Sequence, residues 1–176
     1  MKKNIVIFIF CLASLIILLS ASTVLAQESS REIQEIIFYP GSHVEIKYTD
    51  TSTTNIHLGD SFREVTNLLG LPTKKEKPLY YYIIKNKYNF TFAFNEKGEV
   101  IFIYGFLYNG ETKTNKNVKL HDNPDVLKKV YGNGYIEDKS GNKDDYYIIE
   151  YEALGLGVIN SPKNGIAAFY IFQPEN

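Results

Sequence analysis

Two pairs of carboxylates in the C-terminal third have the types and spacing for acid–base chemistry: Asp144 with Asp145, and Glu150 with Glu152. Positions two apart on a strand point to the same side, so Glu150 and Glu152 would lie about 7 Å apart. A glycoside hydrolase needs two carboxylates at a defined separation, one of them shielded from water. No neighbouring motif places this pair in a pocket, and an exposed strand face accounts for both. Hydrolysis through Glu150 or Glu152 is a third-ranked hypothesis, which requires a carboxylate of raised pKa in a cleft.

Metal, nucleophile and phosphate chemistry have less support. The three histidines, His43, His57 and His121, do not stand at metal-ligand spacing, and a metal site needs convergent ligands with supporting hydrogen bonds. We interpret them as solvated turn residues; the alternative is a symmetric pair of His57 and His121, because each precedes a predicted helix. The motifs G-x-S-x-G, P-loop and H-E-x-x-H are absent from the sequence. The sequence thus predicts a protein that is not an enzyme and uses no cofactor and no metal.

Tyrosine and phenylalanine carry more information, because aromatic residues make up 14% of the chain although it has no tryptophan. From Tyr88 to Asn95 aromatic residues alternate with small or polar ones, which predicts a strand with one buried face. Val100–Phe106 and Ile166–Phe172 are apolar on both faces, so their second face either joins a shared core or stays open as an aromatic surface. Tyrosine suits a binding surface, because its ring packs while its hydroxyl stays hydrated. The candidate partner-binding residues are Tyr80, Tyr82, Tyr104, Tyr108, Tyr147 and Tyr170.

The elements that position these residues occur twice in the sequence. The tetrapeptide YYII stands at Tyr81–Ile84 and again 65 residues later at Tyr146–Ile149. After each copy a polar turn leads into an aromatic run: NEKGE before VIFIYGF, and NSPKNG before IAAFYIF. Upstream, LGDSFREVTNLLG aligns without gaps with LHDNPDVLKKVYG at an offset of 62 residues. An ordered series of helix, strand and turn matches predicts a duplicated folding unit.

Each unit is expected to begin with a short helix. In the first, Ser61 starts a capping box and Gly70 ends the helix; in the second, Asp122 or Asn123 is the cap and Gly132 the end. The strands expected after the helices are Leu79–Lys85, Tyr88–Asn95 and Val100–Phe106, then Asp145–Glu152, Leu156–Asn160 and Ile166–Phe172. The predicted fold is α+β: two tandem α-β-β-β repeats, with an antiparallel sheet and one short helix per repeat packed on one face. One continuous sheet and two separate sheets are both compatible with the pattern.

Four segments follow from this division: a signal peptide (1–26), an N-terminal hairpin and linker (27–55), repeat 1 (56–110) and repeat 2 (111–176). Within the second segment we expect strands Glu35–Tyr39 and Val44–Tyr48 and a polar linker Thr49–Asn55. Lys2 and Lys3, an apolar run and small residues before Ala26 are typical of a secretory signal peptide cut after Ala26. The run Ile5–Leu19 is short for a membrane span of about 20 residues, and an uncleaved anchor is the alternative. The predicted location is secreted or periplasmic, with membrane contact only if the signal segment stays uncleaved.

Composition narrows the classes of partner. Cleavage would remove two of the 19 basic side chains and none of the 20 acidic ones, which leaves a net charge of −3. Without a basic stripe to neutralise phosphates, nucleic acid is not expected as a partner. The same cleavage would remove Cys11, the sole cysteine, and with it any disulfide, thiol nucleophile or thiolate metal site. The mature chain is therefore expected to depend on packing alone.

The pattern IHLGDSFREVTNLLGLP, followed by a tyrosine-rich strand, FTFAF, a polar turn and VIFIYGF, resembles two families of small secreted α+β proteins. One is the beta-lactamase inhibitor proteins, built from tandem helix-plus-sheet repeats. The other is the SmpA/OmlA (BamE) outer-membrane assembly lipoproteins, which carry one such unit. The shared residues are Gly59, the capping pair Asp60–Ser61, Val65 and the helix ending Leu69–Pro72. A fainter likeness, from GSHVEIKYTD through YYY and FNEKGEV, is to the UPF0183 family. These resemblances imply a secreted protein-binding module with no named partner.

The leading hypothesis is a secreted, non-enzymatic module of the bacterial envelope or the extracellular space that binds an unknown protein partner through a tyrosine-rich sheet surface. Polar residues from the loops Thr73–Pro78 and Glu137–Lys143 would surround the tyrosine anchors. The alternative is a small-ligand or lipid-binding envelope protein that uses a cavity between the sheet and the helices.

Overall fold

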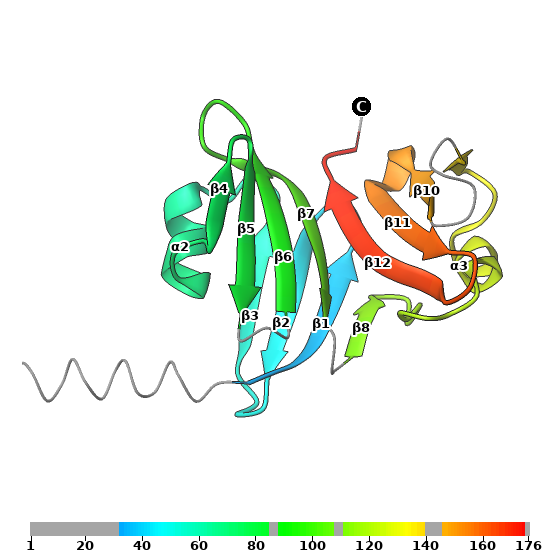
Figure 1. Ribbon diagram of the computed structural model, residues 1–176, viewed down its shortest axis with the longest axis horizontal. Coiled ribbons are helices and arrows are strands. Elements are labelled where there is room, and N and C mark those ends of the chain that lie inside the picture. The colour runs from blue at the N-terminus through cyan, green and yellow to red at the C-terminus, as the bar shows by residue number, and fades with distance from the viewer. Residues whose placement is uncertain (1–31, 85–87, 108–110, 140–145, 175–176) are drawn as a thin grey trace, which may run out of the picture. The chain divides into compact units, whose positions relative to one another are not determined.

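A computed structural model describes residues 32–84, 88–107, 111–139 and 146–174. The residues from Ile33 onward cluster into one compact unit. In the described ranges this unit is a mixed α+β structure made mostly of strands, with two sheets and two α-helices (Figure 1). The α+β class expected from the sequence is therefore confirmed.

The smaller sheet has four strands in the order β3-β2-β1-β8. Its bounds are β1 Ile33–Tyr39, β2 His43–Tyr48, β3 Thr53–His57 and β8 Glu111–Thr114. The first two strands form the expected hairpin, and Gly41 takes the positive φ of 64° that its turn requires. β8 pairs with β1 in parallel, with Phe38 opposite Thr114. The middle of the chain thus returns to extend the N-terminal hairpin.

The larger sheet has eight strands in the order β4-β5-β6-β7-β12-β11-β10-β9. Its bounds are β4 Lys74–Glu76, β5 Leu79–Ile84, β6 Tyr88–Phe94, β7 Val100–Leu107, β9 Ile136–Asp138, β10 Tyr147–Tyr151, β11 Leu156–Ser161 and β12 Gly165–Phe172. β7 and β12 pair antiparallel at its centre, where Tyr104 lies opposite Tyr170. The strands from the two halves of the sequence therefore form one continuous sheet.

Two short helices, α2 (Phe62–Leu69) and α3 (Pro124–Tyr131), start from side-chain caps. Ser61 and Glu64 form the expected capping box, and Asn123 rather than Asp122 caps α3 by accepting from the backbone N–H of Asp125. The helices end alike, at Gly70 (φ 81°, ψ −164°) and Gly132 (φ 87°, ψ −164°), whose positive φ favours glycine.

The chain enters both helices through the same hydrogen bonds. The N–H of Gly59 donates to the carbonyl of Val100 on β7 (2.7 Å), and the N–H of Val100 donates to the carbonyl of Asp60 (2.8 Å). Before the second helix, the N–H of His121 donates to the carbonyl of Ile166 on β12 (2.8 Å), and the N–H of Ile166 donates to the carbonyl of Asp122 (3.0 Å). The carboxylates of both aspartates also accept from the backbone three residues earlier, at 2.7 and 2.8 Å. Each helix start is thereby fixed to one of the two central strands.

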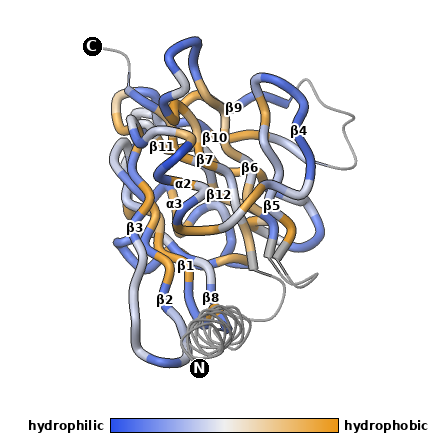
Figure 2. Tube along the Cα trace, turned by 90° about the vertical axis from the view of Figure 1, so that its left-hand side faces the viewer, coloured by the Kyte–Doolittle hydropathy of each residue, from blue (hydrophilic) through white to orange (hydrophobic). Residues whose placement is uncertain are grey.

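The helices and the smaller sheet pack on one face of the larger sheet, which we call the inner face. Residues directly opposite on neighbouring strands share a face, and Phe92, Ile103 and Ile171 form such a row of fully buried side chains. Against this face α2 places Val65 and α3 places Leu127, both fully buried. Hydrophobic residues follow the strands of both sheets, and the turns are mostly hydrophilic (Figure 2). The opposite side of the larger sheet is called the outer face.

Four short strands were not expected. β3 begins inside the predicted linker Thr49–Asn55, and β4 replaces the solvated loop predicted within Thr73–Pro78. β8 and β9 have three or four residues each and no apolar periodicity. All four are terminal strands of a sheet, where one neighbour supplies the hydrogen bonds and no apolar face is needed.

The two YYII segments do not hold equal positions in the sheet. Tyr81 lies inside β5 opposite Thr91, whereas Tyr146 precedes β10 and Tyr147 is that strand's first residue. The helices match at an offset of 62, but the hairpin bulges at Phe94 and Asn160 match at 66.

Neither described helix is long and apolar enough to cross a membrane.

Candidate functional site

Three of the predicted anchors, Tyr80, Tyr82 and Tyr147, lie on the inner face. Tyr82 is only 1% exposed, and burial raises the pKa of its hydroxyl to about 12. Because a partner cannot reach it, Tyr82 belongs to the core and is corrected from an anchor to a packing residue. Tyr80 and Tyr147 are half-buried and remain partly accessible.

Two other predicted anchors, Tyr104 and Tyr170, lie directly opposite each other on the outer face. Tyr104 is half-buried, and Tyr170 is 6% exposed. Tyr108 lies outside the described residues. The six tyrosines therefore do not form one surface, because the alternation of a strand sends neighbours to opposite faces.

Aromatic side chains continue across the outer face beyond these two tyrosines. The ring centroids of Phe102 and Tyr170 are 5.3 Å apart, those of Tyr104 and Phe106 6.0 Å, and those of Tyr170 and Phe172 6.1 Å. We define the outer aromatic face as Tyr81, Phe102, Tyr104, Phe106, Tyr170 and Phe172. Five of its residues lie on the central strands β7 and β12, which have sheet neighbours on both sides, and Tyr81 lies on β5.

The ring of Tyr170 lies across β11 because Gly157, beneath it, has no side chain. A Cβ atom on Gly157 would lie 1.9 Å from Cζ of Tyr170, so the ring occupies the space above this glycine. Its hydroxyl donates to Oε1 of Glu150 on β10 at 2.5 Å. Burial and then this hydrogen bond raise the pKa of Tyr170 well above its usual value. Glu150 thus holds an aromatic ring in place through this hydrogen bond.

The carboxylate pair Glu150 and Glu152 is not arranged as the sequence predicted. β10 ends at Tyr151, and Glu152 starts a 3-10 turn, Glu152–Leu154, where it is exposed. The two side chains therefore do not share a strand face.

A pocket of about 630 Å³ lies beside the first turn of α2. Its apolar wall is Phe62 from the helix, Tyr80 from β5 and Phe94 from β6, whose ring centroids are 4.9–5.5 Å apart. The turn Lys77–Pro78 and the turn that contains Asn95, Glu96 and Gly98 complete the lining. This volume suits a small ligand or a side chain of a partner.

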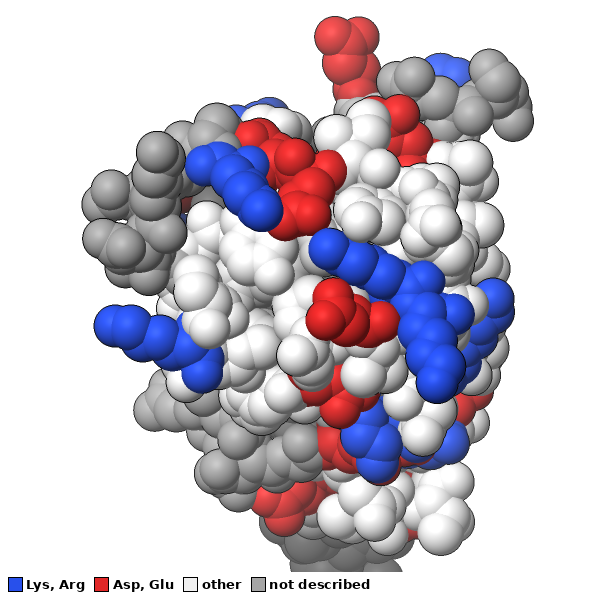
Figure 3. All heavy atoms as spheres, turned by 90° about the vertical axis from the view of Figure 1, so that its right-hand side faces the viewer, with Lys and Arg blue, Asp and Glu red and all other residues white. Residues whose placement is uncertain are grey.

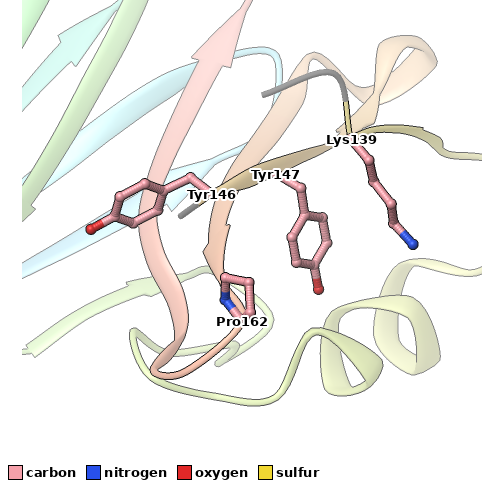
Figure 4. A pocket seen from close by; sticks show the side chains of 4 residues that line it. All are labelled: Lys139, Tyr146, Tyr147 and Pro162. Atoms are coloured by element: carbon pink, nitrogen blue, oxygen red, sulfur yellow. The ribbon is translucent and has the colours of Figure 1, made fainter. Parts of the chain in front are cut away.

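A second pocket, of about 370 Å³, is lined by Lys139, Tyr146, Tyr147 and Pro162 (Figure 4). Tyr146 points toward β12 and Tyr147 toward α3, so the two consecutive residues leave the chain on opposite sides. The Nζ atom of Lys139 lies 5.8 Å from the centre of the Tyr147 ring and also pairs with Glu137 at 2.8 Å. Lysines and carboxylates stand side by side around this part of the molecule, with no large area of one sign in view (Figure 3).

The histidines do not form the pair of His57 and His121 that was the alternative to solvated turn residues, and two of them lie on strands. His43 and His57 lie directly opposite on β2 and β3 with ring centroids 5.0 Å apart, and Tyr39 stacks on His43 at 4.2 Å. His121 lies elsewhere, at the start of α3. Burial and then the charge of His57 lower the pKa of His43. Across the described ranges, no group of three or more His, Cys, Asp or Glu side chains is placed to hold a metal ion.

No protein-family model matches this chain, and no curated protein matches it. Among solved structures it is similar to the crystal structure of a cysteine-rich secretory protein from Staphylococcus aureus, with a TM-score of 0.42 and 10% sequence identity. The match covers 80% of this chain and 50% of that chain, so the present chain spans half the length of that protein.

Proposed function

We propose that this chain is a secreted, non-enzymatic protein-binding module, and that its partner docks on the outer aromatic face. The supporting observation is the one-sided layering of the fold: α2, α3 and the smaller sheet all pack on the inner face. Five of the six rings are half-buried and Tyr170 is buried. Half-buried aromatic rings resemble the anchors of protein interfaces, because they offer contact area at a small cost in side-chain entropy.

The two-repeat arrangement is part of this proposal. Its support is the three matching hydrogen bonds at the two helix starts and the order of strands on each side of the β7–β12 pair. A duplicated unit would place one aromatic central strand from each copy next to the other. The resulting pair would give the module a continuous binding surface that neither copy has alone.

Two further parts of the proposal rest on sequence patterns alone. They are secretion and the likeness to beta-lactamase inhibitor proteins and SmpA/OmlA proteins. They suggest a class of protein, a small envelope or extracellular module, and they do not name its partner. The small-ligand or lipid-binding alternative has one supporting observation, the pocket of about 630 Å³ beside α2, whose lining includes Phe62 from the helix and Tyr80 and Phe94 from the sheet.

The experiment is a capture assay with the tagged chain and envelope and culture-fluid extracts of its source, followed by titration of whichever protein is recovered. Tyr104→Ala and Tyr81→Ala remove rings from the outer aromatic face, and each is expected to weaken binding by about 2 kcal/mol if it is an anchor. Leu71→Ala is the matched control, because Leu71 is an apolar side chain 79% exposed and lies away from this face. Equal affinity of all three variants would reject the outer aromatic face as the binding surface, provided that their unfolding temperatures are alike.

A further inference from the structure

The pocket beside α2 has a wall of three aromatic rings, Phe62, Tyr80 and Phe94, that is not repeated at the same positions beside α3. The corresponding place beside α3 has Pro124 as the first helical residue, where α2 has Phe62. Asn160 holds the bulge position that Phe94 holds in the other hairpin, and Ile149 takes the place of Tyr80 in the strand register. That corner is a polar pocket of about 480 Å³ lined by His121, Asn123, Pro124, Tyr147, Ser161, Pro162, Lys163, Asn164 and Gly165. The three rings of the α2 corner therefore have no aromatic counterparts at these positions, and the rings beside α3 are Tyr131, Tyr135 and Tyr151 instead.

The charges around the aromatic pocket are unevenly placed. The Nζ atom of Lys75 lies 5.1 Å from the centre of the Phe62 ring, and Lys77 lines the pocket directly. Both lysines are exposed, and within the described residues no carboxylate pairs with either of them. Glu96, from the neighbouring turn, is the carboxylate among the lining residues. Lysines elsewhere, such as Lys128 and Lys139, are paired with Glu137.

We propose that this pocket binds an acidic peptide segment of a partner protein, with an aromatic side chain against Phe62, Tyr80 and Phe94 and carboxylates beside Lys75 and Lys77. The occupant follows from charge complementarity, because two lysines without carboxylate partners stand next to an apolar wall. The three rings would supply contact area, and the two positively charged lysines would favour acidic segments over others. The site is on the inner-face side of the sheet, so it is separate from the outer aromatic face and does not depend on it.

The test uses the full chain and three fluorescent nine-residue peptides, measured by anisotropy at low and moderate salt. The first peptide has a central phenylalanine flanked by two aspartates on each side; the second replaces the phenylalanine by alanine; the third replaces the aspartates by asparagines. We expect the first peptide to bind at least about tenfold more tightly than either of the others, with an affinity that falls as salt rises.

The variants separate this pocket from a general effect of charge. Lys75→Glu combined with Lys77→Glu is expected to weaken binding of the first peptide by about tenfold or more, because both residues are exposed and only the charge is reversed. Lys163→Glu combined with Lys129→Glu makes the same change of net charge at two exposed lysines beside α3 and is expected to change affinity by less than about twofold. Equal losses in both proteins, equal binding of all three peptides, or no binding of the first peptide would each overturn the proposal. None of these results depends on the partner of the outer aromatic face.

Discussion

An aromatic ring can lie flat on a sheet only where the strand beneath it lacks a side chain. Gly157 supplies that gap for Tyr170, which then reaches Glu150 on the next strand. Two neighbours on the outer aromatic face pack against this ring, because Tyr170 contacts both Phe102 and Phe172. One glycine thus affects the packing of three rings of that face.

The change Gly157→Ala is expected to lower the free energy of unfolding by about 1–3 kcal/mol, since the new methyl group would displace the ring. Gly134→Ala is the control, because a Cβ there meets no atom within 4 Å, and we expect it to change stability by less than about 0.5 kcal/mol. Denaturant unfolding of both variants measures the difference. Equal stability of the two would show that Tyr170 does not rest on Gly157.

At the scale of elements, the β2–β3 hairpin brings together side chains that the sequence separates. His43 and His57 face each other across it, with Tyr39 on one side of His43 and Glu45 two residues along β2. A proton on one imidazole disfavours a proton on the other, and burial of His43 adds to this effect. Acid should therefore weaken this edge of the smaller sheet.

Stability is expected to fall as the pH drops below about 6.5, the ordinary histidine value. The pKa of His43 is lowered in the folded chain, so in this pH window the unfolded chain binds more protons than the folded chain. Acid therefore shifts the equilibrium toward the unfolded chain. The contribution is fully present above the unfolded pKa and is lost as the pH falls toward the folded value. Unfolding free energies at pH 7.5 and 5.5 should differ less in His43→Gln than in the unchanged chain. A pH dependence that is the same in both would remove His43 as its source.

Much of the fold could be predicted because long strands and capped helices leave strong local patterns. The alternation from Tyr88 to Asn95 and the caps at Ser61 and Asn123 gave elements within a few residues of their observed bounds. The strands Lys74–Glu76 and Ile136–Asp138 could not be predicted, because pairing with a neighbour stabilises them and no apolar period marks them. Strand pairing is a tertiary interaction that a local pattern does not encode.

The candidate site was harder to predict for a related reason. Alternation shows which residues of one strand share a face, as Tyr80 and Tyr82 do on β5. It does not show which face the helices cover, and Tyr82 proved to be core. Phe102, Phe106 and Phe172 were missed as surface residues, although both apolar faces of their strands were visible in the sequence. Each of these phenylalanines stands two positions from Tyr104 or Tyr170 in the same strand, so alternation would have placed them on the same face as those tyrosines.

At the scale of the whole molecule, the two halves of the chain are joined at the middle of one sheet. β7 supplies one central strand and β12 the other, and β8 from the second half completes the smaller sheet. Neither half therefore has a closed hydrophobic core without the other. A chain cut between them would leave β7 as a long edge strand with apolar residues on both faces, which favours aggregation.

A chain that ends at residue 110 is accordingly expected to be insoluble or to unfold without a cooperative transition. The control ends at residue 174 and loses no described strand. Sedimentation and thermal unfolding of the two chains provide the comparison. A soluble, cooperatively unfolding fragment would show that the first half folds by itself, and the shared sheet would then be a docking of two stable parts.

The central place of β12 also has a consequence in time. It follows every other described strand in the sequence, yet the larger sheet cannot be joined across its middle before β12 reaches β7. During synthesis, all the strands before Gly165 would emerge while the central partner of β7 is still missing. We therefore expect the larger sheet to form as a whole only after β12 has been made.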